Sequence, residues 1–275
     1  MTTQTQAGAA GAPATAGPLL KLRGVSKSFG PVQALQDVDF EVHAHEVVAL
    51  VGDNGAGKST LIKAISGVGP ADAGEFYFDG QPVTIHHPTD SAALGISVVY
   101  QDLALADNLD VVANLFLGRE ARRNGFSFMD EIHMEKEARR LLDELKVRTL
   151  RSVRTEVGSL SGGQRQTVAI ARSMLGEPRL VILDEPTAAL GVAQTAQVLD
   201  LVARLRERGL GVVLISHNLA DVFAVADRVV VLRLGRNGGE YPANPEHRNA
   251  VVAAITGADH DIRPGEAMPE EEVGP

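Results

Sequence analysis

The chain has 275 residues, and its 44% hydrophobic and 22% charged residues are typical of a soluble globular protein with one or two domains. The net charge of −9 argues against broad nucleic-acid binding, and the absence of cysteine excludes disulfides and thiolate metal sites and fits a cytosolic setting. No apolar run reaches the length of a membrane-spanning helix, and the first residues do not read as a secretory signal.

Both ends of the chain are predicted to be disordered tails. Residues 1–18 consist mostly of Ala, Gly, Thr and Pro, and residues 258–275 are acidic. After the first tail, residues 20–51 and 75–85 predict an antiparallel flank, because the Asp79-Gly80 dipeptide is a strong hairpin signal.

The central part of the chain predicts an α/β core. Short apolar runs rich in β-branched residues suit strands that are buried on both faces of a parallel sheet. These runs are residues 46–52, 179–185, 211–217 and 228–234. Apolar residues recur at helical spacing over 134–145 and 192–208, and residues 102–176 are predicted to form a mostly helical insert.

A phosphate-binding loop is predicted directly after the first of these runs. Residues 52–60 read GDNGAGKST, which matches G-x-x-x-x-G-K-[ST] between a predicted strand and a predicted helix. The glycines let backbone N–H groups surround the β-phosphate, while the Lys58 ammonium reaches the β- and γ-phosphates and the Ser59 hydroxyl is a Mg²⁺ ligand. A glycine-rich turn that binds nothing is the alternative.

Polar residues at the ends of three later strands predict the rest of a nucleotide site. Asp184 is expected to serve the Mg²⁺ shell and Glu185 to polarise the attacking water, since successive strand residues point in opposite directions. Alternatively, Glu185 only caps or pairs with the following helix. His217 is expected to contact the γ-phosphate, and Gln101 to join the water and Mg²⁺ network, because strand ends converge on the ligand crevice.

A second candidate anion site is the stretch LSGGQRQ, residues 160–166. Ser161, Gly162 and Gly163 precede an apolar-periodic helix whose N-terminal dipole favours an anion. A simple helix N-cap by Ser161 is the alternative.

The motifs follow one another in the order GDNGAGKST, YQ, LSGGQRQ, LVILDEPT and ISH. In this order they resemble the ATP-binding subunit of ABC transporters, over about residues 19–257. Residues 86–120 and 214–236 resemble the branch that imports ribose, xylose, fructose and related monosaccharides. The resemblance implies an α/β fold: a P-loop NTPase (RecA-like) core with an antiparallel β flank and a helical subdomain at about residues 102–176.

The resemblance also implies how the motifs work together. Two cassettes pack head to tail, and each ATP lies between the P-loop of one and the LSGGQ of the other, so a homodimer is expected. Adenine is expected to stack on the ring of Phe29, with a buried core Phe as the alternative. The implied nucleotide contacts are Phe29, Gly52, Asp53, Asn54, Gly55, Ala56, Gly57, Lys58, Ser59 and Thr60, and from the other cassette Ser161, Gly162, Gly163 and Gln164; the implied metal ligands are Ser59, Gln101 and Asp184.

The implied function is ATP hydrolysis with Mg²⁺ that energises monosaccharide import. The partners would be an integral membrane permease and, indirectly, an extracytoplasmic sugar-binding protein, with the chain held peripherally at the cytoplasmic face of the cell membrane. Residues 103–118 are expected to form the core of the helical insert and, in part, a groove for a permease helix. One departure is Gly191, which stands where many family members have Asp and is assigned no role.

Other functions remain open at this point. The nearest is an ABC transporter subunit for a non-sugar substrate, including an exporter. A soluble ABC ATPase acting on ribosomes or DNA is disfavoured by the acidic charge and the single cassette. A degenerate nucleotide-binding regulator is disfavoured by the intact Lys58, Asp184, Glu185 and His217.

Overall fold

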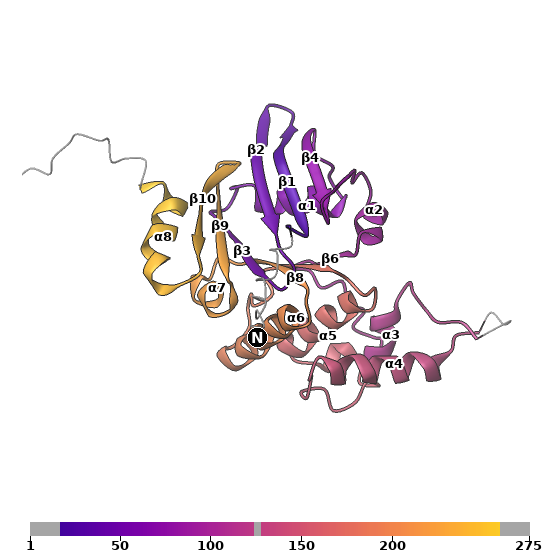
Figure 1. Ribbon diagram of the computed structural model, residues 1–275. Helices are drawn as coiled ribbons and strands as arrows, with labels where there is room; N and C mark the ends of the chain where they lie inside the picture. The colour runs from indigo at the N-terminus through magenta and orange to yellow at the C-terminus, as the bar shows by residue number, and fades with distance from the viewer. Residues whose placement is uncertain (1–16, 124–127, 259–275) are drawn as a thin grey trace, which may run out of the picture.

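The computed structural model describes residues 17–123 and 128–258 (Figure 1). The tails predicted at 1–18 and 258–275 lie outside the described residues, except for residues 17, 18 and 258. Within the described ranges, no helix combines the length and the apolar character needed to cross a membrane.

An antiparallel sheet forms the flank predicted early in the chain. Its strand order is β2-β1-β4-β5. The strands are β1 (Leu20–Phe29), β2 (Val32–Val42), β4 (Ala73–Phe78) and β5 (Gln81–Val83). Asp79 and Gly80 connect β4 to β5 with φ of 53° and 74°, which is the left-handed pair that a tight hairpin requires. The predicted hairpin is therefore confirmed.

A second, mostly parallel sheet forms the centre of the molecule, with the order β10-β9-β3-β8-β7-β6. Its strands are β3 (Val47–Val51), β6 (Ile96–Val99), β7 (Leu180–Asp184), β8 (Gly211–Ile215), β9 (Arg228–Arg233) and β10 (Arg236–Pro242). All four predicted apolar runs lie in this sheet. The prediction that the flank extends through residue 51 is wrong at its end, because β3 pairs in parallel with β8 and β9.

Burial on both faces explains why these central strands are apolar throughout. Along β7, Leu180 and Ile182 pack into the core beneath the antiparallel sheet, whereas Val181 and Leu183 pack into the core formed with the helices. Because side chains alternate along a strand, each face of the sheet receives every second residue.

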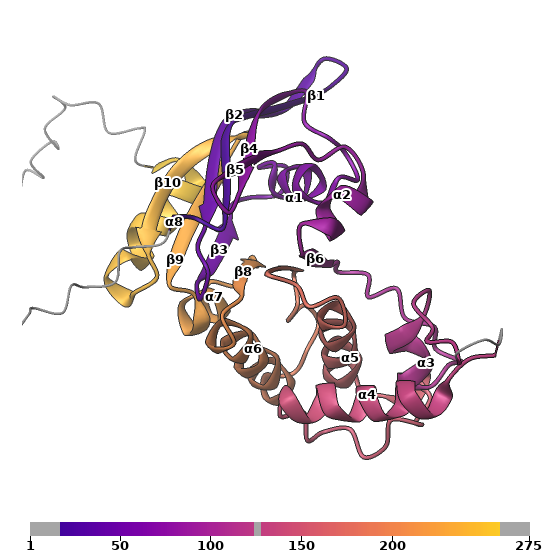
Figure 2. The same cartoon turned by 45° about the vertical axis from the view of Figure 1, so that its right-hand side comes forward.

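Helices cover the parallel sheet and extend from it. Those outside the insert are α1 (Lys58–Ser66), α2 (Pro88–Ala93), α6 (Val192–Glu207), α7 (Leu219–Val225) and α8 (Arg248–Thr256), with a 3₁₀ turn η2 at Pro245–His247. Between β6 and β7 lie α3 (Val111–Phe116), α4 (Glu131–Glu144), the 3₁₀ turn η1 (Val157–Ser159) and α5 (Gly162–Met174). Figure 2 shows α3, α4 and α5 together, on the side of the molecule away from β1 and β2.

Candidate functional site

The loop between β3 and α1 has a shape that only glycine permits at two positions. Gly57 has φ 105°, and a Cβ there would lie 2.8 Å from the carbonyl oxygen of Ala34. At Gly52, with φ 149°, a Cβ would overlap the Leu232 carbonyl. No side chain caps the amino end of α1, and its first turn contains no acid. The loop therefore presents a positive helix end to an anion.

The Lys58 side chain bends back over this loop. Its Nζ donates to the carbonyl oxygens of Gly52 at 2.6 Å and of Asp53 at 3.0 Å. Burial lowers the pKa of Lys58, and the nearby carboxylates of Glu185, Asp53 and Asp184 act in the opposite direction. The ammonium is thus held at the loop with acidic groups facing it.

The carboxylates of Asp184 and Glu185 lie close together at the end of β7. β7 ends at Asp184, whereas Glu185 has a left-handed φ of 50° and donates its N–H to Ile215 of β8 at 3.0 Å. The argument that strand alternation separates the two carboxylates is wrong, because Glu185 is no longer part of the strand. Burial raises the pKa of Asp184, the neighbouring Glu185 raises it further, and Lys58 lowers it.

His217 completes this cluster from β8, two residues beyond the strand end. Its Nδ1 lies 2.8 Å from Glu185 Oε2, while most of its ring remains exposed. The structure therefore brings Lys58, Asp184, Glu185 and His217 together at the carboxyl ends of neighbouring strands. The alternative that Glu185 only caps the following helix does not match this contact, since α6 begins after Gly191.

The other residues predicted near the phosphates lie on α1, on the loop before it and after β6, and their side chains make fewer hydrogen bonds within the site. Ser59 and Thr60 are in the first turn of α1, and Asp53, Asn54 and Gly55 are exposed on the loop. The exposed Gln101 lies in a bend two residues beyond β6. Among the described residues, no hydrogen bond joins its side chain to Lys58, Asp184 or Glu185. Ala56 is buried, and its N–H and carbonyl are hydrogen-bonded to Asp53 and Gly235 within the chain.

Phe29 is the last residue of β1 and is 54% exposed, so the alternative of a buried core Phe is wrong. Lys27 Nζ lies 5.6 Å from the centre of the Phe29 ring and donates to Asp72 at 2.7 Å. Asp72 also accepts the Ser28 N–H at 2.7 Å. Through these contacts the strand end is fixed, and the aromatic ring stays accessible.

The LSGGQ stretch is engaged with its own helix. Ser161 is the N-cap of α5: its Oγ accepts the Gln164 N–H at 3.3 Å, and Gln164 Oε1 accepts the Ser161 N–H at 2.9 Å. Gln164 Nε2 donates to the Thr149 carbonyl at 2.7 Å, so both ends of this amide have partners within the chain. Sequence patterns could not have revealed the Thr149 contact, which joins distant residues.

Gly163 is buried, and a Cβ there would lie 2.9 Å from Gln194 Cβ on α6. Its α-carbon therefore faces the chain's own interior, which adds a packing role to the predicted close approach of a phosphate. A Cβ at Gly162 would meet only the Leu190 Cδ2 methyl, at 3.1 Å. Within the described ranges, no hydrogen bond or ion pair joins residues 161–164 to the P-loop.

Comparison with known proteins identifies the family. The ABC transporter family matches residues 35–188. A fructose import ATP-binding protein of Rhizobium meliloti is 46% identical over 251 residues, which are 90% of this chain and 96% of that protein. The chain belongs to the ABC transporter family. The predicted family and the predicted P-loop NTPase fold are both confirmed.

Further members of the ABC transporter family match most of this chain, although they differ in length. A xylose/arabinose import ATP-binding protein of Sulfolobus acidocaldarius is 46% identical over 79% of this chain and 86% of its own. The chain spans about half of a ribose import ATP-binding protein of Chromobacterium violaceum: 41% identity covers 92% of the chain but 49% of that relative. A solved ABC transporter cassette in its ADP conformation superposes with TM-score 0.75 and 29% identity, covering 86% of this chain and 95% of that one.

This ABC transporter domain also has a groove in its helical part, where residues 103–118 are expected to contribute one. A cavity of about 540 Å³ is lined by α3, α4 and the segment before η1. Val112 and Phe116 are buried beneath it, whereas Leu117 is 49% and Met129 57% exposed. Residues 103–118 thus contribute both to the core and to an open apolar surface.

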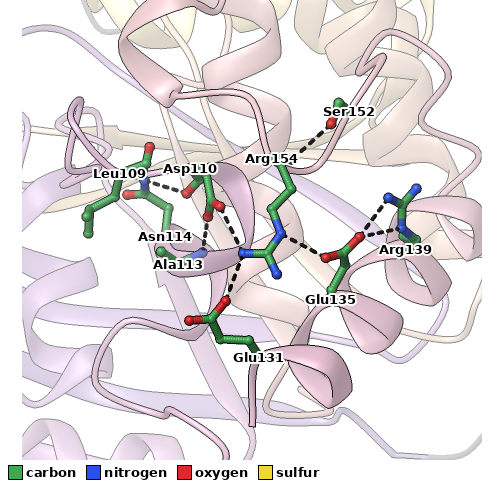
Figure 3. Close-up of polar contacts among 9 residues, drawn as sticks. All are labelled: Leu109, Asp110, Ala113, Asn114, Glu131, Glu135, Arg139, Ser152 and Arg154. Atoms are coloured by element: carbon green, nitrogen blue, oxygen red, sulfur yellow. Dashed lines mark hydrogen bonds and ion pairs between the residues drawn. The ribbon is translucent and has the colours of Figure 1, made fainter. Parts of the chain in front are cut away.

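Acidic side chains surround this groove. Figure 3 shows Arg154 between three carboxylates: it lies 2.8 Å from Glu135, 3.2 Å from Asp110 and 3.5 Å from Glu131. Of these, Asp110 and Glu131 line the groove, and Glu120 and Glu156 line it as well. The carboxylates outnumber the single arginine, so the rim of the groove is negative.

Proposed function

We propose that this chain hydrolyses ATP to energise the import of a monosaccharide through a separate membrane permease. The observation that carries the proposal is the meeting of Lys58, Asp184, Glu185 and His217 beside the P-loop. A cation at a phosphate loop can position a phosphate. A carboxylate that is held by a second side chain can position the attacking water.

Each residue has a part in this proposal. Lys58 exchanges its loop carbonyl partners for the β- and γ-phosphates. Glu185 polarises the attacking water, and His217 orients that carboxylate through the 2.8 Å contact while its exposed ring remains accessible to the γ-phosphate. The accessible ring of Phe29 stacks on adenine, and such stacking discriminates little between bases.

The donor set beside the P-loop fits Mg²⁺. Burial and the adjacent Glu185 raise the pKa of Asp184, so a cation at this carboxylate would be favoured. The Ser59 hydroxyl and the Gln101 amide oxygen are hard oxygen donors of the kind Mg²⁺ prefers. Mg²⁺ is commonly bound by few protein oxygens together with the phosphates of a nucleotide, and this donor set is of that kind. When bound, Mg²⁺ neutralises charge that develops on the phosphates.

A second copy of the chain completes the nucleotide-binding site. Among the described residues, no hydrogen bond or ion pair joins Ser161 or Gly162 at the start of α5 to their own P-loop, which supports their use by ATP bound to the other subunit. A solved relative, a dimeric ATP-binding cassette bound to ADP and Pi, has TM-score 0.67 and 26% identity over 82% of this chain and 99% of that one. ADP lacks the γ-phosphate contacts, so hydrolysis would favour reopening of the dimer.

The sugar class and the permease are supported separately. The fructose and xylose/arabinose import proteins match most of this chain at 46% identity, which supports a monosaccharide as the cargo. The apolar, acid-rimmed groove supports a permease segment that is a short amphipathic helix with a basic residue beside its apolar face. The chain would then sit at the cytoplasmic face of the membrane, and a sugar-binding protein would act on the permease from the opposite side.

Reconstitution tests this function. The permease that co-purifies with the chain is placed in vesicles, and uptake of labelled fructose, xylose and ribose is measured with Mg-ATP supplied on the side of this chain. We expect ATP-dependent uptake of one sugar and none with Glu185→Gln. ATP hydrolysis without uptake of any sugar, but with uptake of another solute, would assign the chain to a non-sugar transporter.

A further inference from the structure

The loop from β6 to α3 carries Gln101, and side chains of other elements hold it on both sides of that residue. Before Gln101, the Tyr100 hydroxyl donates to Ser66 Oγ on α1 at 3.1 Å. After it, the fully buried Asn114 of α3 accepts the Ala106 N–H at 2.7 Å and donates to the Ala106 carbonyl at 2.9 Å. The loop is therefore fixed both to the P-loop helix and to the helix that lines the groove.

The middle of this loop is held by Arg172, from the last turn of α5. The guanidinium donates to the carbonyl oxygen of Leu103 at 2.7 Å and to that of Ala104 at 2.8 Å. Ala104 has a left-handed φ of 47°, a conformation that is unfavourable for a residue other than glycine and persists only when its surroundings impose it. The two hydrogen bonds from Arg172 therefore stabilise the backbone at this strained position.

A half-buried arginine that bonds to neutral carbonyls is energetically unfavourable compared with one that is paired with a carboxylate. Arg172 is half-buried, burial lowers its pKa, and the neighbouring charge of Arg119 lowers it further. Its partners in these two hydrogen bonds are neutral carbonyls rather than carboxylates. A guanidinium fixes its donors in one plane, so it holds two successive carbonyls in a more rigidly defined geometry than the rotating ammonium of a lysine does.

α5 connects this contact to the second anion site. The helix begins at Gly162, directly after its N-cap Ser161, and reaches Arg172 in its last turn, about 15 Å further on at 1.5 Å per residue. We infer that Arg172 is a positioning residue for ATP hydrolysis: it locks the loop that bears Gln101 to the helix that presents Ser161, so that the two move as one unit. The inference rests on the proposed ATP hydrolysis.

Arg204 provides a matched control. It lies on α6 and donates to the Leu145 carbonyl at 2.9 Å and to the Lys146 carbonyl at 3.5 Å, where Lys146 is also left-handed with φ 53°. It is half-buried, contacts the helical insert at residues 145 and 146, and also pairs with Asp200. Arg204 contacts no residue of the candidate site, so its loss reports the structural effect of removing an arginine from two carbonyls.

The test compares Arg172→Met, Arg172→Lys and Arg204→Met in the full chain with Mg-ATP. For Arg172→Met we expect ATP affinity of the dilute monomer within about two-fold of wild type, but kcat lower by about ten- to a hundred-fold, because small misplacements of positioned groups reduce rates strongly. Amide hydrogen exchange over residues 102–106 should be faster. Arg172→Lys should restore part of kcat, and Arg204→Met should lose thermal stability without these changes.

The inference is overturned if kcat of Arg172→Met falls no more than that of Arg204→Met, or if exchange over residues 102–106 is unchanged. Should Arg172→Met fail to fold, Arg172→Lys carries the same comparison, because it retains the charge and the packing but loses the planar set of donors. A wild-type chain that does not hydrolyse ATP at all would instead contradict the proposed function, so the two failures are distinguishable.

Discussion

The P-loop region and the LSGGQ region both place a glycine-rich turn at the start of a helix, but the two helix ends differ. At α1 no side chain caps the helix and no acid lies in its first turn, and the Lys58 ammonium lies against the loop. At α5 the helix end is capped by Ser161, which exchanges hydrogen bonds with Gln164. The backbone N–H groups at the start of α1 therefore remain available to a ligand, whereas side chains already accept hydrogen bonds from part of those at the start of α5.

This difference separates two tasks. The first region gathers a cation, two carboxylates and a histidine within one chain, so it can bind a nucleotide alone. The second adds a hydroxyl and a helix dipole, but no hydrogen bond or ion pair joins it to the first in the described residues. Under the proposed function it contributes to a phosphate that another copy of the chain supplies. Mutations in the first region should therefore reduce ATP binding by the monomer, whereas mutations in the second should reduce dimerisation and hydrolysis.

The largest expected effect is at Lys58. Lys58→Ala removes the ammonium from the loop, and charge-assisted hydrogen bonds contribute about 1.5–3 kcal/mol each, so ATP affinity should fall by about 100-fold or more. Hydrolysis should be lost with it. Fluorescent-ATP titration of the dilute monomer measures this. Near-normal affinity would show that the P-loop region is not the primary nucleotide site.

Motifs that are contiguous in the chain were the easiest part of this site to predict. The P-loop lies within residues 52–60, and its glycines, lysine and serine can be recognised without any tertiary information. The parallel strands were also predictable, since burial on both faces leaves an unbroken apolar run such as Val47–Val51.

Contacts between distant segments could not be predicted in this way. The left-handed turn at Glu185 depends on its bond to Ile215, and the Gln164 amide is engaged by Thr149. Neither leaves a periodic or compositional signal. The inward-facing Gly163 was likewise interpreted only as a phosphate contact, because its neighbour Gln194 comes from another helix.

Next in size is the effect at Glu185. Glu185→Gln keeps the shape of the side chain but removes the base, and general-base catalysis contributes about 10²–10⁴-fold. We expect kcat to fall by that factor while ATP binding and ATP-driven dimerisation persist. Phosphate release and light scattering measure the two properties. A wild-type rate would leave Glu185 with a structural role only.

A smaller effect is expected at Ser161, and it tests the second region directly. Ser161→Asp retains an N-cap acceptor for α5, so the chain should fold normally. The new charge would repel the γ-phosphate of the partner's ATP by about 1–4 kcal/mol at 4 Å, depending on the local dielectric. Dimerisation and hydrolysis should fall, while monomer ATP affinity should not. Ser161→Asn, an equally good but neutral N-cap, is the control.

Mixing the Lys58→Ala and Ser161→Asp variants distinguishes action within one chain from action across a dimer. In a head-to-tail pair of Lys58→Ala and Ser161→Asp chains, one site carries both lesions and the other carries none. Some hydrolysis should return, unless the two sites must act together. If Ser161→Asp weakens ATP binding to the dilute monomer as much as Lys58→Ala does, the LSGGQ region acts within its own chain.

The smallest effect concerns the adjacent glycines of α5 and is one of stability alone. Alanine normally favours a helix over glycine by about 1 kcal/mol. At Gly162 the new methyl would meet only the flexible end of Leu190, at 3.1 Å, so Gly162→Ala should be near neutral or slightly stabilising. At Gly163 it would lie 2.9 Å from Gln194 Cβ on α6, so α5 and α6 would have to separate. Overpacking of this kind costs about 1–3 kcal/mol, and Gly163→Ala should lower the free energy of unfolding in urea by that amount. Equal stability of the two variants would mean that α6 yields at no cost, and Gly163 would then be needed only for a phosphate.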